Sequence, residues 1–440
     1  MKTIRLPSLL LVFGLASALP VHAQSLTQLY EAAFKFDASF QSAKLQYEAS
    51  QAKALQSQAA ILPSAGLNIG ANRTDITSQT AAFDRGTYGN QSATISASQP
   101  LYRPANWLGA EQGKKVADMA QAQLALAEQD LIVRVSQAYF DVLASTDNLQ
   151  FVKAQKTAVV EQLASAKRNF EVGTATITDT REAQARFDLV LALEIAADND
   201  LRVKRIALDQ LTGQTGADPK PLQTSVTLAP IVPNDVNYWV NQSVELHPAI
   251  KLAQLGLAVT QLETQKAEAG HKPTLDLTGS YTMMVNNGSA SSALDYSNRV
   301  TTVGLTLNLP LFAGFAIQNR VDETLALLAK SHADLDAATR TAAQATRTAF
   351  FGVQSGLGQV KALEAAETSS LSALDATKLG YQVGVRINMD VLNSQSVLFD
   401  TKAKLAKARY DVLLGNLKLR QANGSLKSDD LTAINALLVK

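Results

Sequence analysis

The chain has 440 residues, with 40 lysines and arginines against 39 aspartates and glutamates, and no cysteine. So balanced a charge gives no reason to expect nucleic acid or a strongly charged partner, and the lack of cysteine excludes disulfides, thiolate metal sites, a cysteine nucleophile and a lipid anchor on an amino-terminal cysteine. Only 6% of the residues are aromatic, and the abundance of alanine, leucine, glutamine and serine suits long helices packed through small side chains.

Residues 1–23 have the pattern of a secretory signal peptide. Lys2 and Arg5 precede an apolar run, Leu9 to Leu19, and the letters VHA before Gln24 resemble a small-residue cleavage site. The run is too short to cross a bilayer. Its removal leaves 38 basic against 39 acidic residues, so the exported chain carries a net charge of −1.

The rest of the chain is predicted to be a tandem repeat, because its turn residues recur at a nearly constant spacing of 210 or 211 positions. The matching pairs are Pro63 and Pro273, Pro100 and Pro310, Gly173 and Gly384, and Gly213 and Gly424. This spacing divides the chain into a first repeat (24–213), a linker (214–234), a second repeat (235–424) and a carboxy-terminal segment (425–440). We expect the linker and the last segment to form a belt around the middle of the molecule.

Each repeat is expected to contain a helix, two strands, a very long helix and another helix. In the first repeat, helix formers without proline or glycine, then alternation, then heptad-like spacing indicate this order, and the second repeat follows it. The expected ranges are 25–62, 64–77, 89–99, 105–172 and 179–212 in the first repeat, and 235–269, 273–285, 299–309, 315–383 and 390–423 in the second. A helix of about 68 residues is roughly 100 Å long.

The expected strands alternate apolar and polar residues, as in Leu67, Asn68, Ile69. Four strands cannot close a barrel, and open edges in hydrocarbon would leave backbone groups unsatisfied. Two chains would give eight strands, a barrel filled by its own side chains, whereas three would give twelve and room for a water-filled lumen. The same alternation also fits soluble hairpins that cap a coiled coil, so both alternatives remain open at this point.

Several stretches carry a family resemblance. They are the export signal, the letters ILP before Ser64, KPTLDL from Lys272, PLFAG from Pro310, and above all YQVGVRINMDVLNSQSVLFDTKAKLAKARYDVLL from Tyr381 to Leu414. With the twofold repeat, they resemble the TolC family of outer-membrane channel proteins over essentially the whole exported chain. Because Gln24 stands where a lipidated relative has cysteine, the chain resembles the unlipidated branch.

The resemblance implies a fold and a role. The fold is α plus membrane β-barrel: a homotrimer with a 12-stranded outer-membrane barrel and a long periplasmic barrel of 12 helices. The implied role is an exit duct for tripartite efflux pumps or type I secretion in a Gram-negative bacterium, opened when a partner untwists the entrance helices. The implied partners are a periplasmic adaptor, an inner-membrane RND, ABC or MFS transporter, and outer-membrane lipid.

Two turns, each with a Val-Gly pair, join the long helices to the helices that follow. Gly173 and Gly384 are expected to end helices, since glycine tolerates the left-handed conformation. Asp179 lies three residues before Glu182, a capping-box spacing, and Asp390 is expected to cap the next helix alone. Capping explains what the two copies share.

The two turns differ, because Tyr381 and Arg386 replace Phe170 and Ala175 of the first copy. If both turns ring the periplasmic mouth, Tyr381 and Arg386 could bond Thr178 and Asp179 of an adjacent turn as a latch. The resemblance supports that latch.

The resemblance also implies an acidic ring at the constriction. Asp390 matches one ring position, whereas Asn393 occupies the second. We therefore expect weaker cation selectivity than in a relative with two rings.

Catalytic chemistry has little support in the sequence. His22 lies in the signal, and His247, His271 and His332 are scattered without ligand spacing. No phosphate loop and no nucleophile with a base and oxyanion site is found, so we expect no enzyme, cofactor or metal site. A trimeric channel is the first hypothesis, and a periplasmic or surface coiled-coil scaffold or adhesin is the alternative.

Overall fold

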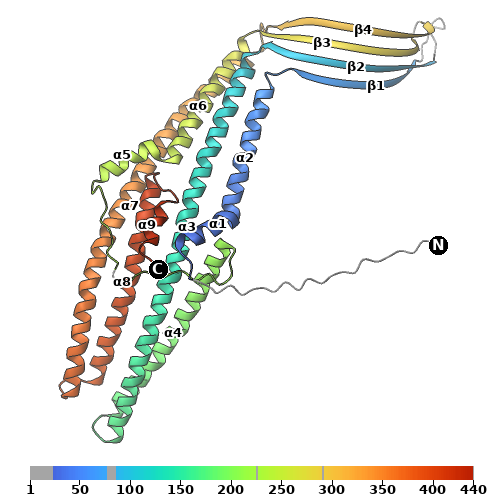
Figure 1. The fold of residues 1–440 in the computed structure, drawn as a ribbon. Coiled ribbons are helices and arrows are strands. Elements are labelled where there is room, and N and C mark those ends of the chain that lie inside the picture. The colour runs from blue at the N-terminus through green and yellow to red at the C-terminus, as the bar shows by residue number, and fades with distance from the viewer. Residues whose placement is uncertain (1–22, 77–85, 224–225, 290–291, 440) are drawn as a thin grey trace, which may run out of the picture.

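The computed structural model describes residues 23–76, 86–223, 226–289 and 292–439. The expected signal peptide therefore lies almost entirely outside the described residues. A four-stranded sheet forms one end of an elongated molecule, and two helical hairpins form the other end (Figure 1). No helix in the described part of the chain is both long and apolar enough to cross a membrane.

The two repeats have the same order of elements. The first contains α1 (Leu26–Phe36), α2 (Ala38–Ala59), β1 (Ser64–Ile76), β2 (Gly86–Tyr102), α3 (Pro104–Glu171) and α4 (Ile177–Thr212). The second contains α5 (Val236–Leu246), α6 (Pro248–Glu268), a 3₁₀ turn (Ala269–His271), β3 (Thr274–Ser289), β4 (Ser292–Asn308), α7 (Ala316–Gln382) and α8 (Asn388–Ala422), and α9 (Asp430–Asn435) follows.

The long helices α3 and α7 run from the sheet to the far tips, where each turns back into a shorter helix (Figure 1). In α3, 68 residues span roughly 100 Å at about 1.5 Å per residue. Two shorter helices, α2 and α6, lie along the part of the rod next to the sheet (Figure 1). The other two, α4 and α8, lie along the part that ends at the tips.

The helices expected over 25–62 and 235–269 are each broken, and the expectation of continuous helices is wrong there. The breaks fall at Asp37 and His247, which lie 210 positions apart. Asp37 accepts a hydrogen bond from the Phe40 amide at 2.8 Å and so caps α2. At His247, Nδ1 accepts a hydrogen bond from the Ala249 amide at 3.1 Å, and the following proline disfavours helical backbone at this residue.

The largest buried cluster lies at mid-rod, where α1, α3, α4, α8 and α9 meet. It contains Leu29, Leu131, Tyr139 and Phe140, which are at most 2% exposed, and Leu431 of α9. The linker and the last segment join here through a bridge between Leu222 and Leu438. The belt therefore covers the middle of the rod with apolar side chains.

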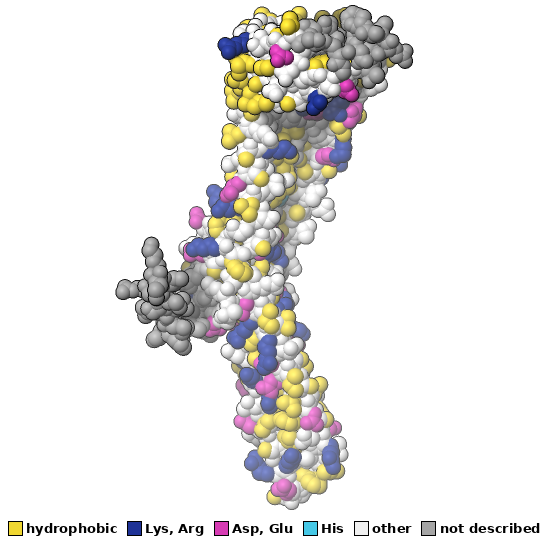
Figure 2. All heavy atoms as spheres, turned by 90° about the vertical axis from the view of Figure 1, so that its right-hand side faces the viewer, with side chains coloured by type: hydrophobic (Ala, Val, Ile, Leu, Met, Phe, Trp, Pro, Cys, Tyr) yellow, Lys and Arg dark blue, Asp and Glu magenta, His cyan; other side chains and the backbone are white. Residues whose placement is uncertain are grey.

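The sheet is antiparallel in the order β1-β2-β3-β4, and its register separates two faces. Directly opposed residues share a face, so Leu67, Ile95 and Tyr281 lie on one face, with Ile69 and Met283 two residues along. The opposite face is polar: the Asn90 amide donates to Asn286 Oδ1 at 2.6 Å, and the Thr94 and Thr282 hydroxyls are 3.0 Å apart. Figure 2 shows hydrophobic side chains gathered at the sheet end, whereas charged side chains are scattered along the rod.

Candidate functional site

The candidate site is the pair of hairpin tips farthest from the sheet. Both tips have the same backbone: Gly173 and Gly384 each adopt φ +78°, a left-handed conformation that glycine tolerates. The Gly173 amide donates to the Phe170 carbonyl at 3.0 Å, and the Gly384 amide donates to the Tyr381 carbonyl at 3.1 Å. The two glycines therefore end α3 and α7 in the same way.

A capping box starts α4, but it is not the one expected from the sequence. Thr176 is the N-cap, and its hydroxyl oxygen accepts from the Asp179 amide at 3.3 Å. In return Asp179 Oδ2 accepts from the Thr176 amide at 2.9 Å and from the Thr176 hydroxyl at 2.7 Å. Asp179 thus closes a box that begins at Thr176, and the expected box between Asp179 and Glu182 is wrong. Thr178 lies exposed in the same first turn.

The start of α8 has no side-chain cap, so the expectation that Asp390 caps it is also wrong. The N-cap residue is Ile387, whose side chain has no hydrogen-bond acceptor. Asp390 lies in the first turn, and its Oδ2 is 3.7 Å from Arg386 Nη1. The Arg386 side chain is 60% exposed, so this single ion pair leaves most of the guanidinium open to solvent.

The predicted latch residues do not meet within one chain. Among the contacts of the described residues, none joins Tyr381 or Arg386 to Thr178 or Asp179. The Tyr381 hydroxyl instead accepts from Asn169 Nδ2, at 3.2 Å, and so links α7 to α3. A latch between adjacent turns would therefore have to form between chains.

Four side-chain hydrogen bonds join the first hairpin to the second near the tips, and the sequence reading missed them all. Their pairs are Gln155 with Ser396 at 3.3 Å, Gln162 with Asn388, Asn169 with Tyr381 at 3.2 Å, and Arg186 with Asn393 at 3.3 Å. All but one of these eight residues align in the other repeat with an alanine, glycine, valine, isoleucine or phenylalanine, and Asn393 aligns with Glu182. In the sequence, the sign of these contacts is a polar residue in one repeat opposite a different residue at the equivalent position of the other.

Asn393 has a structural partner as well as its predicted ring position. Its Oδ1 accepts from Arg186 Nη2 at 3.3 Å, which ties α8 to α4. An amide suits this position because it can accept from the guanidinium without adding a charge. The side chain of Asp390 remains 37% exposed at the tip.

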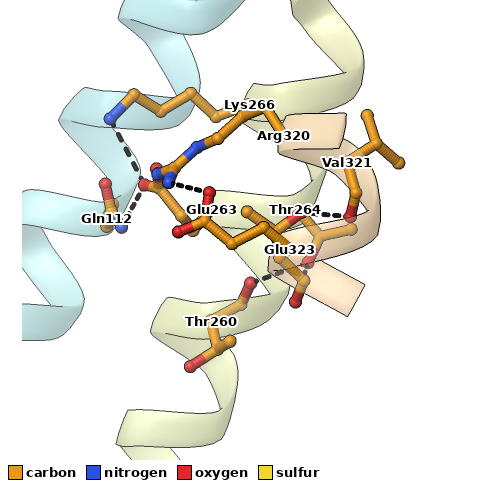
Figure 3. A network of polar contacts seen from close by, with 9 residues as sticks. Gln112, Thr260, Glu263, Thr264, Lys266, Arg320, Val321 and Glu323 are labelled. Carbon is orange, nitrogen blue, oxygen red and sulfur yellow. Dashed lines mark hydrogen bonds and ion pairs between the residues drawn. The ribbon is translucent and has the colours of Figure 1, made fainter. Parts of the chain in front are cut away.

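A second polar cluster lies near the sheet, where α3, α6 and α7 meet (Figure 3). Glu263 on α6 accepts from Gln112 Nε2 at 3.0 Å, from Arg320 Nη2 at 2.7 Å and from Lys266 Nζ at 3.3 Å. Burial acts to raise the pKa of Glu263, but these donors outweigh it and hold that pKa below its usual range. Glu263 therefore stays ionised and holds three helices together.

The described residues hold no group of three or more histidines and acidic residues that could bind a metal ion. The polar clusters instead consist of ion pairs and amide or hydroxyl contacts between helices. Such contacts fix how the helices pack against each other.

Known proteins with a similar sequence share this order of two repeats. A model of the family described as "Outer membrane efflux protein" matches residues 29–214 and 239–425, the two repeats. The chain is 34% identical to the outer membrane protein TolC of Vibrio cholerae over 94% of both chains. It is 30% identical to the alkaline protease secretion protein AprF of Pseudomonas aeruginosa, over 93% of this chain and 86% of that protein.

A solved structure agrees in fold. The outer membrane protein VceC of Vibrio cholerae superposes with a TM-score of 0.78 and 18% identity, over 91% of this chain and 96% of that one. The expected fold class and the TolC resemblance are confirmed, and the comparisons give the scaffold or adhesin alternative no support.

Proposed function

Because this chain belongs to the outer membrane efflux protein family, we propose that three copies form one continuous duct through the outer membrane and across the periplasm. The duct serves a tripartite efflux pump, a type I secretion system, or both. Protein secretion is supported by the relative AprF, whose name assigns it to the secretion of alkaline protease.

The observation that carries this proposal is the two-faced sheet with two open edges. Its apolar face includes Ile69, 75% exposed, and Val303, 74% exposed, which suits contact with lipid. Its other face carries serine, threonine and asparagine, which suit a water-filled lumen. The edges of β1 and β4 need partners in a membrane, and three copies supply twelve strands.

The helical rod supplies the periplasmic part of the duct. The roughly 100 Å length of α3 and α7 carries the tips far from the membrane, toward the inner-membrane components. A periplasmic adaptor and an RND, ABC or MFS transporter of the inner membrane are the proposed partners. Docking of the adaptor untwists the entrance helices and opens the tips.

The tips form the gate in this proposal. Arg386 and Tyr381 of one copy engage Asp179 and Thr178 of the adjacent turn. Both capping bonds of Asp179 use Oδ2, which leaves Oδ1 to accept from a guanidinium. Three copies of Asp390 meet as the acidic ring, where their mutual repulsion attracts cations. Asn393 leaves the second ring uncharged.

Planar-bilayer recording on the purified protein tests the function. A duct with a closed gate gives a small, stable single-channel conductance, and light scattering in detergent gives the mass of three chains. Fractionation should recover the protein with the outer membrane. A monodisperse monomer that adds no conductance to the bilayer would contradict the proposal.

A further inference from the structure

A groove lies where the sheet joins the rod, between the start of α3 and the end of α6. Its volume is about 520 Å³. Its apolar wall consists of Leu101 and Tyr102 from the end of β2, and of Trp107 and Leu108 from the start of α3. Trp107 is 42% exposed, and Leu101 and Tyr102 are each 45% exposed. The groove therefore leaves large apolar side chains uncovered within the chain.

The groove opens on the apolar side of the sheet. Tyr102 lies opposite Leu275 in the register of β2 and β3. Leu275 shares a face with Leu277 and Tyr281, because residues two apart on a strand point to the same side. In the proposed duct this face contacts lipid, so the groove lies at the membrane surface next to the rod. Tryptophan and tyrosine favour that position because their rings combine an apolar body with one polar group.

The polar side of the groove carries one negative and one positive charge. Glu268 is the last residue of α6, and Lys272 comes just before β3. Both are exposed, and neither side chain takes part in a hydrogen bond or an ion pair with another described residue. The Lys272 backbone amide donates to the Ala269 carbonyl at 3.0 Å, which fixes the chain between the two charges. The two charged groups thus face one groove without pairing with each other.

Two charged side chains close by in the sequence are engaged elsewhere. Arg103 precedes α3, and its Nε and Nη2 donate to the two carboxylate oxygens of Asp276 at 2.7 and 2.5 Å. Lys266 of α6 donates to Glu263 at 3.3 Å (Figure 3). Neither neighbour supplies a counterion to the groove, so its own carboxylate and ammonium groups stay available to a ligand.

We propose that this groove binds one phospholipid with a phosphoethanolamine head group. Lys272 Nζ donates to the phosphate, Glu268 accepts from the ammonium group, and an acyl chain lies along Leu101 and Trp107. A zwitterionic head group is complementary to an anion and a cation that share a groove. This inference rests on the proposed duct, which brings the groove to the membrane surface, and it adds a lipid class and the residues that select it.

Hydrogen bonding and charge select this head group over other lipids. The choline group is also a cation, but it has no N–H to donate to Glu268. Phosphatidylglycerol offers a phosphate to Lys272, yet it brings no cation and sets its negative charge beside the carboxylate. Each of these lipids leaves one charge of the groove without a partner, which is how a polar site discriminates between ligands.

One repeat alone carries the two charges. Gln58 and Leu62 stand 210 positions before Glu268 and Lys272, so the equivalent place in the first repeat has no charge to offer a zwitterion. The site therefore occurs once in each chain. Three such lipids then bind to the proposed duct of three copies.

Tryptophan fluorescence in bilayers tests the proposal. Trp107 lies in the groove, whereas the second tryptophan, Trp239, is 8% exposed on α5, farther from the sheet (Figure 1). The protein is reconstituted into phosphatidylcholine vesicles whose brominated acyl chains quench a tryptophan that they touch. Unbrominated phosphatidylethanolamine should restore the emission about three- to tenfold more effectively than unbrominated phosphatidylcholine, the preference that two exposed ion pairs would give. The variant Trp107→Phe gives the background.

Variants with altered charge identify the groups that select the lipid. Glu268→Gln with Lys272→Met should abolish the preference for ethanolamine over choline. The matched control, Glu111→Gln with Lys114→Met, removes the same charges from exposed positions of α3 outside the groove and should keep the preference. Glu268→Gln alone should bring phosphatidylglycerol closer to phosphatidylethanolamine. Soluble phosphoethanolamine, which has the charges but no acyl chains, should not compete.

The outcomes separate this inference from the proposed duct. Equal displacement by the three lipids on the wild type identifies ordinary boundary lipid and overturns this inference alone, even if the double variant assembles poorly. So does a preference that survives the double variant, a preference for phosphatidylglycerol, or competition by soluble phosphoethanolamine. If no brominated lipid quenches Trp107, the groove lies outside the membrane, and that result contradicts the proposed duct itself.

Discussion

The two hairpin tips share one backbone and differ in their side chains. Gly173 and Gly384 have the same φ of +78° and equivalent carbonyl partners. Yet α4 starts with a reciprocal capping box between Thr176 and Asp179, whereas α8 starts at Ile387 without a side-chain cap. One carboxylate is engaged in its own helix start, and the other is free of that task.

The two tips share the backbone geometry of the repeat and differ only in the side chains around it. The turn geometry depends on glycine and on backbone hydrogen bonds, so it survives large changes of sequence. The side chains around it are under no such constraint. Asp179 closes the capping box of its own helix, whereas the Arg386 side chain is 60% exposed, and the proposed latch assigns them the roles of acceptor and donor.

The largest expected effect comes from removing the proposed hydrogen-bond donors of the second tip, Arg386 and Tyr381. Arg386→Ser combined with Tyr381→Phe should raise single-channel conductance strongly. Each charge-assisted link is worth about 1–3 kcal/mol, which shifts an equilibrium about 5- to 150-fold. Planar-bilayer recording measures the effect. The matched change at the first tip, Ala175→Ser with Phe170→Leu, should leave conductance near wild type. If the double variant at the second tip conducts like the wild type, the latch is refuted.

The next effect separates the two tasks of Asp179. Asp179→Asn keeps an acceptor for Thr176 but loses the charge, so it should raise conductance and leave the helix start intact. Asp179→Ala should also lose the reciprocal half of the capping box, the hydrogen bond from the Thr176 amide to the Asp179 carboxylate, at a cost of about 1 kcal/mol. Hydrogen exchange of the amides at 174–182 should rise only in the alanine variant. As a control, Asp390→Ala removes no cap, and faster exchange at the start of α8 would show that the uncapped description is mistaken.

A smaller change concerns ion selectivity. Asp390→Asn should lower the preference for cations, measured as the reversal potential in a salt gradient, because it removes the charge of the ring. Asn393→Asp should raise that preference only slightly, since Arg186 lies 3.3 Å away and would pair with the new carboxylate. Adding Arg186→Gln should release the full effect. Equal selectivity in all four channels would argue against a ring at these positions.

The smallest expected effect is on the pH dependence of stability, which should differ between the helix breaks at Asp37 and His247. Burial lowers the pKa of His247, so the unfolded state binds the proton first and stability falls as pH drops below about 6.5. The hydrogen bond from Arg134 lowers the pKa of Asp37, and its contribution is lost only as pH falls below about 4. His247→Asn should therefore weaken the dependence of the thermal unfolding midpoint on pH between pH 5 and 8. The matched variant His332→Asn should keep the wild-type dependence.

Local signals in the sequence predicted much of this architecture. Proline and glycine punctuate the repeat, and alternation marks the strands, because both depend on residues next to one another in the chain. The start of β4 was placed too late, at 299 instead of Ser292, since the intervening residues do not alternate clearly. The break at Asp37 was missed because Arg134, 97 positions away, stabilises the capping carboxylate through bonds at 2.9 and 3.1 Å.

The candidate site was predicted in part. The proposed latch residues come from comparing the two copies, which isolates what backbone geometry does not require. Their partners within the chain were not found, because the bonds of Tyr381 to Asn169 and of Asn393 to Arg186 depend on which helix faces meet. Sequence spacing alone does not determine how two long helices rotate about their axes.

By itself, the sequence determined the duplication, the order of elements, the length of the rod and the glycines at its tips, because each follows from propensity, periodicity or spacing along the chain. The tertiary structure decided which residue caps each helix, which polar pairs join the hairpins and which hydrophobic residues stay exposed. Those outcomes depend on residues that lie far apart in the chain and meet only when α3, α7 and their partners pack together.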